Sequence, residues 1–205
     1  MYPTRFSTPL TGLDWLQWYG AHKVYHPGVD FNYGSGWDDF GQDIVAAKKG
    51  TIEYIYTGWN HRGFGNFVII KHEDGNYSRY AHMDKVRVVQ GNKVNEGSKI
   101  GTLGNTGTQS PHLHFEIFNE KMAVIQRKHW NPWRFYPSNK SKQYVTEHYL
   151  NPWTWLDQTS NDTEMEKAIK WAIDRGIATN FNGTQPTKEE VALMLYRYNE
   201  LKKGL

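Results

Sequence analysis

The sequence predicts a mainly β protein: a compact antiparallel β-sheet system with loop-rich insertions, followed by a small α-helical domain. Between residues 43 and 118, short apolar runs alternate with glycine-bearing turns, a pattern typical of antiparallel sheets. Aromatic residues make up 15% of the chain, which suits β structure. Beyond residue 157, apolar residues recur every three or four positions, as in amphipathic helices. We therefore expect two domains, residues 1–157 and 158–205.

Composition narrows the classes of function. The net charge of +3 comes from scattered Lys and Arg residues, so a nucleic-acid partner is not expected. The chain has no cysteine, so a metal would need His, Asp or Glu ligands. No apolar run approaches the ~18 residues of a membrane span, and residues 1–6 do not begin a signal peptide. We therefore expect a chain without a membrane partner or an export signal.

The elements of the first domain follow in order. Residues 1–25 predict an extended lead-in, with a short helical turn at 13–19. Pro27 and Gly28 then predict a turn that leads into a short strand carrying Asp30. Asp74-Gly75, between two alternating runs, predicts a hairpin. The strands expected after residue 43 are Ile44–Ala46, Thr51–Thr57, Asn66–His72, Tyr77–His82, Val86–Val89, Lys99–Leu103 and His112–Phe118.

The remaining chain changes character twice. Residues 119–148 show little periodicity and predict an aromatic, loop-rich insertion that returns to the first domain at 149–156. A polar linker at 157–162 follows. Two helices are then expected: one with an apolar stripe from Met165 to Ile173, and one that begins at Thr187 with a capping-box Glu190.

The segment from residue 110 to 118 organises the chain. His112, His114 and Glu116 alternate with apolar residues, which predicts a half-buried strand with the three polar side chains on one face. Taken alone, the histidine pair fits two solvated or core-packed side chains better than it fits a metal site. His26 and Asp30 alone would fit a hydrogen bond that stabilises a turn.

Together, however, His26, Asp30, His82, His112 and His114 form a set with a chemical meaning. Two histidines and a carboxylate are a common ligand set for catalytic zinc, which activates water. No helical His-Glu-x-x-His motif is present, so another group must act as the base, and a spare histidine titrates near neutral pH.

Four motifs occur in an order and spacing that resembles the lysostaphin-type zinc endopeptidases. They are His26-x-x-x-Asp30, Tyr80-Ala81-His82-Met83, Gly104-Asn105-Thr106-Gly107 and Pro111-His112-Leu113-His114-Phe115-Glu116. The resemblance covers about residues 20–157.

The resemblance implies a peptidase domain that cuts peptide bonds in bacterial peptidoglycan with one Zn²⁺ per chain. It implies that His26, Asp30 and His114 hold the zinc, and that His112 is the general base. His82 would orient the attacking water or stabilise the oxyanion. Glu116 fits either a support for a zinc ligand or a role at the surface or sheet edge.

The C-terminal helices resemble a single S-layer-homology repeat, which implies wall binding; a hairpin that packs on the first domain or self-associates is the alternative. A wall hydrolase without an export signal fits a phage endolysin. It would be made in the host cytoplasm and act on the wall after release, or be carried on the virion. Three alternatives stay open: a non-catalytic wall-binding or hydrolase-activating module of the same fold, a metal hydrolase of other peptides, and a scaffold with a vestigial site.

Overall fold

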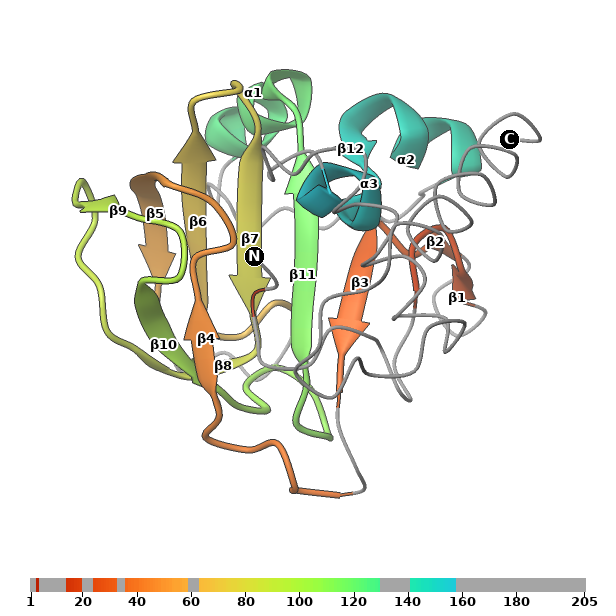
Figure 1. Cartoon of the computed structure of the whole chain (residues 1–205). Coiled ribbons are helices and arrows are strands. Elements are labelled where there is room, and N and C mark those ends of the chain that lie inside the picture. The colour runs from red at the N-terminus through yellow and green to blue at the C-terminus, as the bar shows by residue number, and fades with distance from the viewer. Residues whose placement is uncertain are drawn as a thin grey trace, which may run out of the picture. The chain divides into compact units, whose positions relative to one another are not determined.

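A computed structural model describes residue 3 and residues 14–19, 24–32, 36–58, 63–129 and 141–157 (Figure 1). Twelve strands and three helices lie in these ranges. The strands are β1 (Trp18–Tyr19), β2 (Val24–Tyr25), β3 (Gly28–Phe31), β4 (Asp43–Val45), β5 (Gly50–Tyr56), β6 (Phe67–His72), β7 (Tyr77–Ala81), β8 (Met83–Val86), β9 (Lys93–Val94), β10 (Lys99–Leu103), β11 (Leu113–Phe118) and β12 (Tyr149–Leu150). The helices are α1 (Glu120–Lys128), α2 (Lys142–His148) and α3 (Pro152–Asp157).

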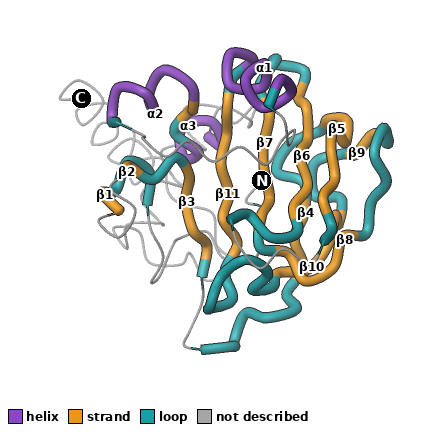
Figure 2. Tube along the Cα trace, turned by 180° about the vertical axis from the view of Figure 1, so that it is seen from behind, coloured by secondary structure: helices purple, strands orange, loops and turns teal. Residues whose placement is uncertain are grey.

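A seven-stranded antiparallel sheet forms the centre: six strands follow the order β12-β11-β7-β6-β5-β9, and the seventh, β3, also pairs with β11. One edge of β11 pairs with β7, and its other edge is shared by β3 and β12. A second sheet has the order β4-β10-β8, and β1 pairs with β2. Figures 1 and 2 show α1 and α2 at the end of the sheet where β11 finishes, so the end where β11 begins is bordered by loops.

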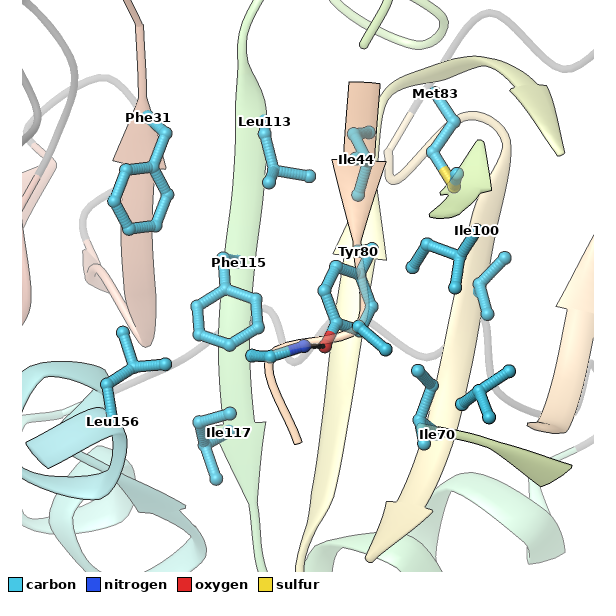
Figure 3. Packing of buried hydrophobic residues seen from close by; sticks show 14 of the residues in the cluster. Phe31, Ile44, Ile70, Tyr80, Met83, Ile100, Leu113, Phe115, Ile117 and Leu156 are labelled. Atoms are coloured by element: carbon cyan, nitrogen blue, oxygen red, sulfur yellow. Dashed lines mark hydrogen bonds between the residues drawn. The ribbon is translucent and has the colours of Figure 1, made fainter. Parts of the chain in front are cut away.

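The large sheet buries apolar side chains on both faces. On one face, β11 contributes Leu113, Phe115 and Ile117 to a core shared with the three-stranded sheet and α3 (Figure 3). On the other, Phe118 packs in a second cluster with Met122 of α1 and neighbouring aromatic residues. All six residues of β11 are buried. The expected half-buried strand is therefore wrong, because packed elements cover both faces; the predicted alternation of polar and apolar side chains is present.

The structure confirms the mainly antiparallel β fold and most expected strands. The Asp74-Gly75 hairpin joins β6 to β7, and Gly75 has the positive φ of +82° that such turns favour. The strand expected at 86–89 lies instead at Met83–Val86, and β9 was not expected. The helical turn expected at 13–19 is also wrong in its described part, because residues 15–16 form a tight turn in which Leu16 has a φ of +57°, and residues 18–19 form β1.

The loop-rich insertion expected at 119–148 instead contains two helices in its described part. Asn119 caps α1 by accepting a hydrogen bond from the Met122 amide, and Ser141 caps α2 through Tyr144. The return to the first domain is correct: β12 pairs with β11, and α3 follows at once.

The chain divides into two compact units, Met1–Thr159 and Ser160–Leu205. The second unit lies outside the described residues, so its expected helices and the S-layer-type repeat stay predictions. Among the described helices, none is long and apolar enough to cross a membrane.

Candidate metal centre and active site

Strand register brings two of the predicted ligands together. In the antiparallel pairing of β3 with β11, Asp30 lies directly opposite His114. Directly opposed residues point to the same face of a sheet, here the face away from Leu113, Phe115 and Ile117. Both side chains are buried, and Asp30 Oδ1 lies 3.0 Å from His114 Nδ1.

His26 completes a cluster of three donor atoms. Its Nε2 lies 3.0 Å from His114 Nδ1 and 3.3 Å from Asp30 Oδ1, and its side chain is also buried. A tetrahedral zinc ion with bonds of about 2.0–2.1 Å separates its ligand atoms by roughly 3.3 Å. The observed spacing and the donor types therefore fit a zinc ion.

A strap at residues 14–17 holds His26. The Nδ1–H of His26 faces the Asp14 carbonyl at 3.3 Å, and the backbone N–H of His26 donates to the Gln17 carbonyl at 2.9 Å. Asp14 is itself held by α3, because Trp153 Nε1 donates to Asp14 Oδ1 at 2.8 Å. This support was not predicted from the sequence, since Asp14 and Trp153 belong to no recognisable motif.

Charges and hydrogen bonds within the cluster shift the pKa values of two of the proposed ligands, Asp30 and His114. Burial alone would raise the pKa of Asp30, but the two histidines, through charge and hydrogen bonds, keep it well below its usual range. Burial alone would lower the pKa of His114, yet hydrogen bonds to Asp30 and Glu116 raise it to about 9. The cluster therefore favours a positive charge at the point where the three donors meet.

His114 is also held from behind. Its Nε2–H donates to Glu116 Oε2 at 3.0 Å, and Glu116 Oε1 accepts from Arg79 Nη1 at 2.7 Å. Zinc-binding histidines usually donate their second N–H to a carboxylate or carbonyl. We expected Glu116 either to support a zinc ligand or to lie at the surface or sheet edge. The structure shows it buried behind His114. Arg79 was missed because its partnership depends on strand register.

His82 and His112 lie beside this cluster, with ring centroids 4.6 Å apart. Each ring bonds a backbone carbonyl through Nδ1: His82 the Thr106 oxygen at 2.8 Å, and His112 the Ser110 oxygen at 2.9 Å. In each neutral ring the proton is therefore on Nδ1, and Nε2 carries a lone pair. Burial lowers the pKa of His82 to about 3, assisted by the charges of His112 and His114.

Two loops position His82. It follows β7 with a φ of +61°, which is uncommon for a residue other than glycine, and donates its backbone N–H to Phe64. Thr106, whose carbonyl fixes the ring, bonds the Asn66 amide and the Met83 carbonyl through its hydroxyl. The Gly104–Gly107 motif is thus a support for His82.

The structure brings all five predicted site residues to one region. His72 lies outside these motifs; it is buried and bonds Ser78 and Lys49. His22 and His61 lie outside the described residues.

Residues 24–131 match peptidase family M23. The chain belongs to peptidase family M23. The match covers β2 to α1, and so contains all five site residues and the supports Arg79, Thr106 and Glu116.

Several curated relatives of this M23 chain are similar in sequence. The murein hydrolase activator NlpD of Escherichia coli is 36% identical over 137 residues, which cover 64% of this chain and 33% of that protein. The lipoprotein NlpD of Yersinia enterocolitica is 41% identical over 97 residues, covering 47% of this chain and 92% of that one. The chain thus matches about a third of the length of the Escherichia coli relative.

Among solved structures, a zinc-containing peptidase from Vibrio cholerae is 29% identical, with a TM-score of 0.47. The alignment covers 57% of this chain and 35% of that one.

The relatives correct one expectation. We expected a chain without a signal peptide, made in the cytoplasm of a phage host and released to the wall or carried on the virion. Relatives from Yersinia enterocolitica, Haemophilus influenzae and Escherichia coli are instead named lipoproteins. Lipoproteins are held at membranes by a lipid anchor. The relatives therefore contradict the expected localisation, and a phage origin has no support.

Proposed function

We propose that this M23 domain is a zinc metallopeptidase that hydrolyses peptide bonds in bacterial peptidoglycan. The observation that carries the proposal is the convergence of His26 Nε2, Asp30 Oδ1 and His114 Nδ1, with two further histidines beside them. These three donors would hold one zinc ion per chain. When bound, zinc would supply a Lewis acid that acidifies water and polarises a peptide carbonyl.

His112 is the proposed general base. Its ring is half-buried, so substrate and water can reach it, and its Nδ1–H is committed to the Ser110 carbonyl. Nε2 can therefore take the proton of the attacking water as its oxygen bonds to the peptide carbon. The same nitrogen then returns the proton to the amine nitrogen as the C–N bond breaks.

The tautomer of His82 separates the two roles expected for it. With Nδ1–H donated to Thr106, the neutral ring presents Nε2 as an acceptor. An acceptor can hold an O–H of the attacking water, whereas an oxyanion requires a donor. We therefore assign His82 to orienting the water.

A second candidate function is the activation of another murein hydrolase without catalysis. The name of the Escherichia coli relative favours this function, and the curated relatives support it better than they support a lytic enzyme. The donor set and the two adjacent histidines support the peptidase, because an activator needs neither a metal nor a base.

The peptidase requires His112 as its base, whereas the activator does not require it. The experiment measures zinc per chain by atomic emission and peptide release from purified peptidoglycan, for the wild type and His112→Ala. His148→Ala, which removes a histidine from the end of α2, is the matched control.

The peptidase proposal expects one zinc in all three proteins, with peptide release lost only in His112→Ala. Mass spectrometry of the products would then identify the bond. Absence of release by the wild type, combined with equal stimulation of a separate murein hydrolase by wild type and His112→Ala, would replace the peptidase with the activator. Absence of zinc from the folded wild type would overturn the metal site itself.

A further inference from the structure

Behind His114 lies an ion pair that is completely buried. Arg79 on β7 and Glu116 on β11 are cross-strand partners, and both side chains are 0% exposed. Glu116 uses one oxygen for Arg79 Nη1 at 2.7 Å and the other for His114 Nε2 at 3.0 Å. The three side chains form a continuous line from the hydrophobic interior to the metal centre.

Stability alone does not account for this pair. Burying two charges removes their hydration, and apolar residues of similar size often stabilise a core as well or better. The surroundings are strongly apolar: the Arg79 guanidinium lies 3.9 Å from the Phe64 ring centroid, with Phe67 and Phe118 at 5.2 and 5.4 Å. A carboxylate at this position would be very costly without the arginine.

We propose that Glu116 and Arg79 are positioning residues that determine which nitrogen of His114 holds the metal. Glu116 accepts the Nε2–H, so the lone pair of the ring is on Nδ1, facing Asp30 and His26. Arg79 Nη1 donates to the other oxygen of Glu116 and so fixes the orientation of the carboxylate. The inference rests on the metal centre of the proposed function but not on the reaction catalysed there.

Glu116→Gln tests the pair with almost no change in shape. An amide has one acceptor oxygen, so glutamine can serve either Arg79 or His114, and its NH₂ group must face the other donor. We expect zinc to bind 10–100-fold more weakly, as is typical when a carboxylate behind a zinc ligand is removed. A competing chromophoric chelator gives the dissociation constant.

Glu120→Gln is the matched control, because it removes a carboxylate that bonds Arg127 and Tyr77 on the exposed side of α1. Its zinc affinity should equal that of the wild type. Equal affinity in Glu116→Gln would overturn the inference but leave the peptidase proposal intact. A wild type that binds no zinc would overturn the metal site instead.

A second measurement needs no variant and so does not depend on the folding of Glu116→Gln. Nitrogen-15 NMR of the zinc-loaded wild type reports which ring nitrogen of His114 carries the proton. We expect Nε2 to be protonated and Nδ1 to be the ligand. Coordination through Nε2 would overturn the inference directly.

Discussion

His72 should make the domain less stable as the pH falls below 6.5, and His72→Gln should remove that sensitivity. The ring is 4% exposed, donates Nδ1–H to the Lys49 carbonyl at 2.9 Å and accepts from the Ser78 hydroxyl at 2.7 Å. The Trp155 ring lies 4.8 Å away. The site thus satisfies the neutral ring, whereas a second ring proton on Nε2 would require the Ser78 hydroxyl to rotate and accept instead of donate.

The size of the effect follows from the pKa. Burial lowers the pKa of His72 from 6.5 to about 4, and the hydrogen bond to Lys49 opposes this only in part. Between these two pH values the unfolded chain binds a proton that the folded chain does not, so stability falls as pH falls. From pH 7.5 to 5.5, a pKa of about 4 in place of 6.5 predicts a loss of about 1.3 kcal/mol.

Urea unfolding of the wild type and His72→Gln at both pH values measures this loss. Glutamine does not titrate, and the other histidines affect both proteins equally, so the stability difference between the two proteins isolates His72. Glutamine should cost stability at pH 7.5, and that cost should shrink by about 1.3 kcal/mol at pH 5.5. An equal difference at both pH values would refute the assignment of a neutral, buried His72.

Two further predictions concern the loop that positions His82. Thr106→Val keeps the side-chain shape but removes the hydroxyl bonds to Asn66 and Met83, so urea unfolding should show a loss of about 1–3 kcal/mol; unchanged stability would contradict it. Gly65→Ala should destabilise the domain more than Thr106→Val does. The new Cβ would lie 2.0 Å from the Thr106 carbonyl oxygen, and residue 65 has a φ of +58°. Peptide release should then fall while zinc content stays at one per chain, and wild-type turnover would show that the Thr106 carbonyl does not position His82.

Local signals account for the parts of the fold that the sequence predicts well. Alternation and glycine turns located most strands, and the Asp74-Gly75 turn located a hairpin, because both depend on neighbouring residues. The helix α1 was missed although Asn119 is a good cap and Glu120 follows it. Its buried positions are few, so apolar periodicity is weak there.

The residues of the candidate site also fall into those with a local signal in the sequence and those without one. The five motif residues could be predicted because each lies in a short recognisable segment. Their supports could not, because the Arg79–Glu116 contact depends on which strands become neighbours, and the burial of His72 depends on the packing of Trp155 from the far end of the domain.

His26 is supported by residues from both sides of the segment 24–131, and this has a consequence for how the domain can evolve. Asp14 precedes the segment shared with peptidase family M23, and Trp153 follows it, 139 positions away in the chain. A fragment trimmed to residues 24–131 would retain every ligand and lose the strap that holds one of them. Mutations in the flanks can therefore alter the metal centre while the inherited motif stays intact, so members of one family can diverge in activity without changing a catalytic residue.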